Sequence, residues 1–347
     1  MLSPGLRWAW RTADTVQFGI DVPEPLIISG LPPFSQRLLP LLDGVRSPAE
    51  IFASMESDPA ERAEHAEVQA VIERLIAIGV VFDGGLWPGG IDLSPADRDR
   101  LAPDVRCASA LERFRSRPAA RWNALAASQV VMVGASRLGA TISRALAGAG
   151  VSRLDVQDAH PVTAADVSSG GFTPHDVGRR RSELVSLHAE RAAEPPPGDT
   201  RQRLVVVTDA VDTHDVCRSL AATDDPHLVV SCREMIGRVG PLVEPGRSPC
   251  FFCRDLARRD VDAGWSDVWR QRVTDPSPDA DSVLVGITAH IAAAHVVDWL
   301  TGGRPPSWGG FVEIVAPHGA ATTRTLTQHP ECGCAWPDSP ASPTMGT

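Results

Sequence analysis

An alternation of apolar runs and amphipathic segments from residue 130 onward constrains the fold more than any other feature of this chain. The apolar run Val130–Val133 leads through a glycine-containing turn into Leu138–Ala149, and Leu154–Asp158 follows as a second strand. Two later apolar runs continue the alternation, at residues 204–207 and 228–230. Apolar strands that alternate with helices are typical of a parallel sheet with crossover helices. The sequence therefore predicts an α/β domain.

Glycines occupy two positions of the turn after the first of these strands. Gly134 ends the strand, Gly139 lies in the first turn of the helix, and Ser136 stands where a phosphate-binding loop has its middle glycine. Asp158, at the end of the second strand, stands where a ribose-binding carboxylate would lie. The pattern predicts a Rossmann-type turn and leaves two interpretations open: a turn that serves only the fold, or one that still binds a nucleotide.

A second acidic position follows the apolar run at 204–207. Asp212 is expected near the carboxyl end of that strand, where open parallel sheets bind their ligands. Its carboxylate could hold Mg²⁺ beside phosphates, or it could cap the helix that follows. The sequence favours neither role.

The composition limits the chemistry open to the chain. All 33 basic residues are arginine, so reactions that need a lysine amine are excluded. A net charge of -10 argues against nucleic acids and anionic membranes as partners. The N-terminus lacks a signal-peptide pattern, and the apolar stretch Val283–Leu300 carries His290, His295 and Asp298. We therefore expect a cytoplasmic protein in which that stretch is a buried helix rather than a membrane span.

The first part of the chain has a different pattern, which predicts a separate small unit. Three short strands are expected at Trp8–Trp10, Thr15–Ile20 and Pro25–Ile28, and three helices follow them. The second of these helices begins with a capping box at Ser47–Glu50. Val80–Phe82 is expected to close the unit as a further strand.

A chain of 347 residues is longer than a domain with a single hydrophobic core usually is, which supports a division into domains. Glycine and proline clusters between the two patterns indicate a connecting segment. We predict a winged-helix domain with three strands and three helices over residues 1–95, a linker over 96–118, a mostly parallel Rossmann-like domain over 119–336 and a disordered tail over 337–347.

Four of the seven cysteines form two close pairs about eighty residues apart. Two residues separate Cys250 from Cys253, and one residue separates Cys332 from Cys334. Two such pairs match a tetrahedral structural zinc site, in which each pair supplies two thiolates. The second pair is one residue shorter than usual, and His329 is near enough in sequence to be a substitute ligand. Reduced thiols in the core are the alternative.

Over residues 118–336 these features resemble the ThiF/MoeB-type, ubiquitin-activating-like adenylyltransferases. The resemblance rests on Gly134, Gly139, Asp158, the segments Asp176–Gly178 and Thr208–Asp212, and the two cysteine pairs. The segments Gly240–Cys250 and His329–Cys334 resemble the ocin-ThiF-like branch of cyclodehydratase partner proteins. The first domain resembles the PqqD-type leader-recognition domain of that branch. The relationship implies a zinc-containing, dimeric scaffold.

The same resemblance indicates which parts of an adenylating site are altered. Adenylating members use a full glycine loop, an arginine finger, a lysine near the Asp-x-Gly turn and a Mg²⁺-binding aspartate. Here the loop lacks its middle glycine, Ser168–Phe172 contains no arginine, and Arg179–Arg181 stand in the lysine region. A planar guanidinium differs in shape and reach from an ammonium group. We therefore expect a degenerate ATP site at Gly134, Gly139, Asp158 and Asp212, without catalysis.

The resemblance implies a scaffold that binds the leader of a ribosomal precursor peptide and delivers it to a separate YcaO-type cyclodehydratase, in thiazole/oxazole-modified, bacteriocin-like peptide biosynthesis. Strand addition at a sheet edge beside a helix would supply the affinity. The predicted peptide contacts are Leu26, Ile27, Ile28, Val68, Val71 and Leu75. Two alternatives stay open: an active adenylyltransferase acting on a peptide or carrier-protein carboxylate, and an assembly subunit that binds the synthetase but not the leader.

Overall fold

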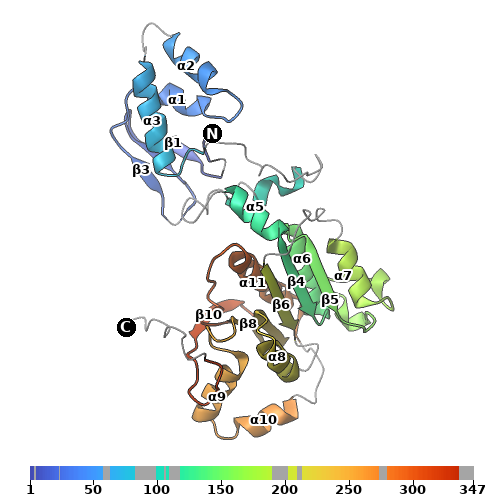
Figure 1. Ribbon diagram of the computed structural model, residues 1–347. Coiled ribbons are helices and arrows are strands. Elements are labelled where there is room, and N and C mark those ends of the chain that lie inside the picture. The colour runs from blue at the N-terminus through green and yellow to red at the C-terminus, as the bar shows by residue number, and fades with distance from the viewer. Residues whose placement is uncertain are drawn as a thin grey trace. The chain divides into compact units, whose positions relative to one another are not determined.

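The chain divides into two compact units, Met1–Asn123 and Ala124–Thr347, in a computed structural model. The structure describes residues 1–3, 5–22, 24–57, 63–82, 99–104, 107–108, 118–189, 202–208, 213–272 and 280–335. Figure 1 shows the helices and strands of both units. Most of the predicted linker and all of the predicted tail lie outside the described residues.

The first unit contains a three-stranded antiparallel sheet in the order β1-β2-β3, as the sequence predicts. Its strands are β1 (Trp8–Trp10), β2 (Val16–Phe18) and β3 (Leu26–Ile28), and its helices are α1 (Ser35–Leu41), α2 (Pro48–Glu56) and α3 (His65–Ala77). Alternating residues of β2 face the helices, so Val16 and Phe18 are buried in one apolar cluster with Leu38 and Met55. This unit therefore has a core of its own.

Two local features of the first unit follow from the sequence to different extents. The capping box of α2 forms as predicted, because the Ser47 hydroxyl accepts the Glu50 N–H at 3.3 Å while Glu50 accepts the Ser47 N–H at 2.8 Å. The structure corrects the prediction of a strand at Val80–Phe82. Only Val81 pairs with Leu2, as an isolated bridge. Backbone hydrogen bonds from Ser3 to Val80 and from Phe82 to Met1, each 2.8 Å long, flank this bridge.

The second unit is built on one seven-stranded sheet in the order β10-β9-β8-β7-β6-β4-β5. The strands β5, β4, β6 and β7 run parallel, and β8, β9 and β10 continue the sheet antiparallel. The strands are β4 (Ser128–Val133), β5 (Arg153–Gln157), β6 (Gln202–Thr208), β7 (His227–Arg233), β8 (Ile236–Val243), β9 (Gly310–Val315) and β10 (Ala320–Thr325). The predicted crossover architecture is thus confirmed in its parallel half.

Helices pack on both faces of this sheet. The helices described from residue 118 onward are α5 (Pro118–Ala126), α6 (Arg137–Gly148), α7 (Arg181–Ala189), α8 (Thr213–Ala222), α9 (Phe251–Val261), α10 (Trp265–Arg272) and α11 (Ser282–Leu300). Helices α6 and α11 pack into the main apolar cluster on one face, and α8 contributes Val216 and Leu220 to a cluster on the other. The all-apolar strands are therefore buried from both sides, as parallel strands require.

Helix α11 is the one described helix whose length and composition would allow it to cross a membrane, with a mean hydropathy of 1.6. Its side chains nevertheless pack against the sheet and α6, and Ala289, Ala292 and Val296 are completely buried in the main cluster. The prediction of a buried core helix fits this packing.

Candidate functional site

Both glycines of the turn between β4 and α6 are required by the backbone of the turn itself. Gly134 has a φ of +87°, a conformation that favours glycine. A Cβ on Gly139 would lie 2.3 Å from the carbonyl oxygen of Gly134. The Thr208 hydroxyl, at the end of β6, donates to that same oxygen at 3.1 Å. The glycine spacing is thus explained by the close packing of strand, turn and helix, without a ligand.

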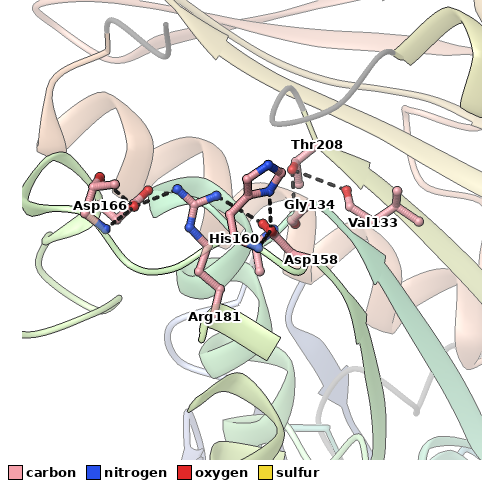
Figure 2. A network of polar contacts seen from close by, with 9 residues as sticks. Val133, Gly134, Asp158, His160, Asp166, Arg181 and Thr208 are labelled. Atoms are coloured by element: carbon pink, nitrogen blue, oxygen red, sulfur yellow. Dashed lines mark hydrogen bonds and ion pairs between the residues drawn. The ribbon is translucent and has the colours of Figure 1, made fainter. Parts of the chain in front are cut away.

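The carboxylate of Asp158 lies at this turn and is bonded by the protein itself, as Figure 2 shows. It accepts the backbone N–H of Ala135 at 2.8 Å, the backbone N–H of His160 at 2.9 Å and Nη1 of Arg181 at 3.1 Å. Burial acts to raise the pKa of Asp158, but these hydrogen bonds outweigh it and hold the pKa below its usual value. Asp158 is therefore an ionised group with internal partners.

Arg181 connects this carboxylate to a second one (Figure 2). Its other terminal nitrogen donates to Asp166 at 2.7 Å, and Asp166 also accepts the backbone N–H of Thr163 at 2.8 Å. The Arg181 side chain is only 12% exposed, and those of Asp158 and Asp166 are 2% and 4% exposed. One guanidinium thus bridges two buried carboxylates at the position where a ribose-binding group was predicted.

Sequence reasoning noticed the run Arg179–Arg181 but missed this pairing. A run of three arginines does not say which of them turns inward, and Asp166 lies in a 3-10 turn (Ala164–Asp166) that gave no motif. The terminal nitrogens of Arg137 are similarly committed, since they donate to the carbonyls of Ala280 and Val167 at 3.0 and 3.2 Å. Both guanidiniums therefore hold the fold together around the turn.

The predicted magnesium ligand Asp212 lies outside the described residues, as do its neighbours from position 209 onward. Thr208, the last described residue before this gap, is completely buried. Of the four residues predicted for the nucleotide site, the structure therefore brings together Gly134, Gly139 and Asp158.

The two cysteine pairs meet at one point in the second unit. The sulfur of Cys250 lies 3.7 Å from that of Cys253 and 3.4 Å from that of Cys332, and the sulfurs of Cys253 and Cys334 are 3.3 Å apart. All four sulfurs lie within 4.8 Å of one another. Tetrahedral zinc with bonds of about 2.3 Å places its sulfur ligands about 3.8 Å apart. The donor set and its dimensions fit a structural zinc ion.

Local structure explains how these sulfurs converge. Cys250 stands at the N-cap of α9 and Cys253 in its first turn, so both side chains point to one end of the helix. Gly333, with a φ of +70°, reverses the chain between Cys332 and Cys334. Hydrogen bonds from Cys250 and Cys334 lower the pKa of the Cys253 thiol. One thiolate is thus already favoured within the cluster.

His329 is not a substitute ligand, which corrects the alternative drawn from the sequence. Its ring nitrogen Nε2 lies 2.8 Å from a carboxylate oxygen of Asp260, on α9. Only its backbone N–H faces the cluster, donating to the Cys253 sulfur at 3.3 Å. The imidazole therefore fastens the cysteine loop to the helix, and the four cysteines form the site.

The predicted peptide contacts fall into two groups. On α3, Val68, Val71 and Leu75 are at most 7% exposed and belong to the core of the first unit, so this structure leaves them inaccessible to a peptide. On the edge strand β3, Ile28 is also buried, whereas Ile27 is 48% exposed. The helical spacing of the first group reflects core packing. Only the β3 edge retains an accessible apolar side chain.

Comparison with known proteins places this architecture among ThiF-type folds. Residues 110–195 match the model of the ThiF family. The solved structure of E. coli MccB with AMPCPP and MccA is similar, with a TM-score of 0.67 and 14% sequence identity over 97% of this chain and 99% of that one. The microcin C7 biosynthetic enzyme MccB with N-formylated MccA gives a TM-score of 0.67 at 13% identity, over 97% and 99% of the two chains.

The structure of PaaA is also similar, with a TM-score of 0.68 and 15% identity over 93% of this chain and 98% of that one. No curated protein matches the sequence. At these identities the likeness is one of fold. It extends over nearly the whole length of the chains compared, beyond the segment that matches the family model.

Proposed function

Since the chain carries a ThiF-type domain, we propose that it is a peptide-binding partner protein of ribosomal peptide natural-product biosynthesis, and that it does not adenylate. In this role it binds the leader of a precursor peptide and presents the precursor to a separate YcaO-type cyclodehydratase, which forms the azoline rings. The carrying observation is the Asp158 carboxylate, whose partners are Arg181, two backbone N–H groups and Nδ1 of the His160 ring. A nucleotide ribose would have to displace them.

The β3 edge supports the peptide-binding part of the proposal. Strand β3 pairs with β2 on one side and is the last strand of its sheet, and an edge strand offers unpaired backbone groups to an extended peptide. Arg74 of α3 donates to the Ser29 carbonyl at 3.4 Å, which fixes the helix beside the end of β3. E. coli MccB has been crystallised with MccA, and its fold covers the first unit as well as the second.

We further propose that the four-cysteine cluster holds a structural zinc ion, because four sulfur donors at tetrahedral spacing form a closed site. The ion would tie the start of α9 to the loop after β10. A closed site leaves no position for water or substrate, so the zinc would stabilise the fold and take no part in a reaction. By analogy with the fold family, we propose a homodimer, which light scattering would test.

A second candidate function is ATP-dependent adenylation of a peptide or carrier-protein carboxylate. The observation that favours it is the likeness to MccB, which has been crystallised with AMPCPP and with ATP. The structure described here offers Arg181 and Arg137 near the turn, but both already donate to groups of the protein. Adenylation would require these contacts to rearrange.

A calorimetric titration of the zinc-loaded protein with Mg²⁺·ATP, followed by an ATP–pyrophosphate exchange assay, separates the two functions. The partner-protein proposal expects no heat up to millimolar ATP and no exchange, with or without peptide. Micromolar binding together with exchange would replace it with adenylation. The variant Ser136→Gly serves as a control, because restoring the middle glycine leaves the Asp158–Arg181 pair in place and is expected not to restore binding.

Peptide binding is tested with a labelled precursor peptide encoded next to this chain, by fluorescence anisotropy. Ile27→Glu places a charge on the exposed face of β3 and is expected to weaken binding at least tenfold. Val45→Glu is the matched control, since Val45 is an 88% exposed apolar residue outside the sheet. Equal affinity of both variants and the wild type would refute the β3 site.

A further inference from the structure

A pocket of about 470 Å³ lies between helix α9 and the antiparallel half of the large sheet, and its lining shares no residue with the glycine turn. Its volume is within the range of small-ligand sites. Four arginines line it: Arg238 from β8, Arg254 and Arg258 from α9, and Arg324 from β10. Four guanidiniums around one concave site are unusual in a chain with a net charge of -10.

The carboxylates of the pocket are already bonded within the protein. Glu313 accepts Nε of Arg238 at 2.8 Å and lies 3.6 Å from Nε of Arg324. The other two acidic lining residues are also engaged: Asp255 lies 3.2 Å from Nε2 of His214, and Asp262 accepts the Gly264 N–H at 3.1 Å. Four guanidiniums face three carboxylates, so the lining carries one surplus positive charge.

Two of the guanidiniums retain capacity for a further acceptor. The Arg254 side chain is 16% exposed. Its contact with Asp255 is long, at 3.5 Å. Arg258 stacks 4.0 Å above the Trp265 ring and forms no ion pair within the described part of the chain. The two guanidiniums that retain this capacity therefore both lie on the α9 wall.

Most of the remaining lining is apolar. Phe311 and Leu326 on the sheet side face Ala257 and Val261 on the helix side. Val261 is 91% exposed, and it leaves an apolar rim that nothing in the described chain covers. An occupant that buried this rim would gain about 25 cal/mol for each Å² of apolar surface removed from water.

We propose that this pocket binds a peptide segment in which one carboxylate lies beside an apolar side chain. The carboxylate would pair with Arg254 and Arg258, whose planar forks match it, and the apolar side chain would pack against Phe311 and Val261. A single negative charge balances the surplus of the lining, whereas a phosphate dianion would exceed it. The proposal is independent of the leader site at β3 and of the role of the glycine turn.

The test uses the full-length, zinc-loaded protein in ligand-observed saturation-transfer NMR with two peptides, N-acetyl-Leu-Glu-Leu-amide and the same peptide with Gln in place of Glu. Inorganic phosphate is added as a competitor, because it has no carbon-bound protons to observe. We expect the acidic peptide to bind and the Gln peptide to bind at least tenfold more weakly. Arg258→Gln is expected to reduce the affinity for the acidic peptide about tenfold, which corresponds to about 1.4 kcal/mol. Arg46→Gln, in the first unit, removes the same charge and should change nothing.

Each other outcome overturns the proposal. Equal binding of the acidic and Gln peptides would show that the guanidiniums do not distinguish a carboxylate from a neutral amide. Phosphate that binds more tightly than the peptide and displaces it would make the pocket a phosphate site. No saturation transfer to either peptide at millimolar concentration, with circular dichroism confirming the fold, would mean that the pocket does not bind a peptide of this kind.

Discussion

The four-cysteine cluster and the Asp158 turn are both places where distant segments of the second unit meet. They differ in the groups that face their buried polar atoms. At the cluster the four sulfurs face one another within 4.8 Å. At the turn the carboxylates of Asp158 and Asp166 face a guanidinium supplied by the chain. The first arrangement offers four sulfur donors whose spacing would fit a metal ion, whereas the second already contains its cation, the Arg181 guanidinium. Two clusters of polar groups within one unit can thus differ in their need for a ligand.

The largest expected effect is at the cluster. Cys253→Ser removes one of four thiolates, and loss of the metal would lower the free energy of unfolding by more than about 4 kcal/mol. Urea denaturation and zinc analysis by mass spectrometry measure both quantities. Cys217→Ser is the control, since Cys217 is equally buried but lies outside the cluster, and about 1 kcal/mol is expected there. Unchanged stability and metal content in Cys253→Ser would mean that the cluster does not depend on a metal and does not differ from the turn in this respect.

A smaller but still substantial effect is expected when the internal partner is removed from the turn. Arg181→Met leaves two buried carboxylates without their counter-charge, and a loss of about 3 kcal/mol in the free energy of unfolding is expected. The adjacent Arg180→Met should cost less than about 0.5 kcal/mol, because its ion pair with Glu183 is exposed. If the two variants unfold at the same urea concentration, Arg181 does not hold the turn together.

The glycine turn itself offers the next test. Gly139→Ala drives a Cβ toward the carbonyl oxygen of Gly134, and about 1–3 kcal/mol of destabilisation is expected from this overpacking. Gly148→Ala, at the other end of α6, meets no atom within 4 Å and should be neutral or slightly stabilising. Thermal unfolding of the two variants compares them directly. A stable Gly139→Ala protein would mean that the turn is looser than the structure indicates.

The smallest effect concerns pH. Because the pKa of Asp158 is lowered in the folded state, its contribution to stability is fully present above the unfolded pKa of about 3.9 and is lost as the pH falls toward the lower folded pKa. Asp158→Asn should therefore show a shallower loss of stability below pH 4 than the wild type, measured by urea denaturation at several pH values. Parallel pH profiles would indicate that other groups dominate acid unfolding.

Much of the fold could be predicted because it is encoded locally. The all-apolar run Val130–Val133, the capping box at Ser47 and the helix signals around them depend only on near neighbours, and each formed where expected. The strand expected at Val80–Phe82 is a single bridge from Val81 to Leu2, and no local pattern indicated that partner. Helical spacing likewise could not show whether Val68 and Leu75 face a ligand or the core. A ligand-binding face and a core-facing face of a helix have the same spacing of apolar residues.

By itself, the sequence determined the alternation of strands and helices, the positions of the turn glycines, the absence of lysine and the two cysteine pairs, because periodicity, composition and short spacings are local properties. Only the tertiary structure decided that Arg181 bridges Asp158 and Asp166, that His329 faces Asp260 and that four arginines from three elements share one pocket. Those arrangements depend on which side chains of distant segments meet when the sheet assembles, and no local pattern specifies that.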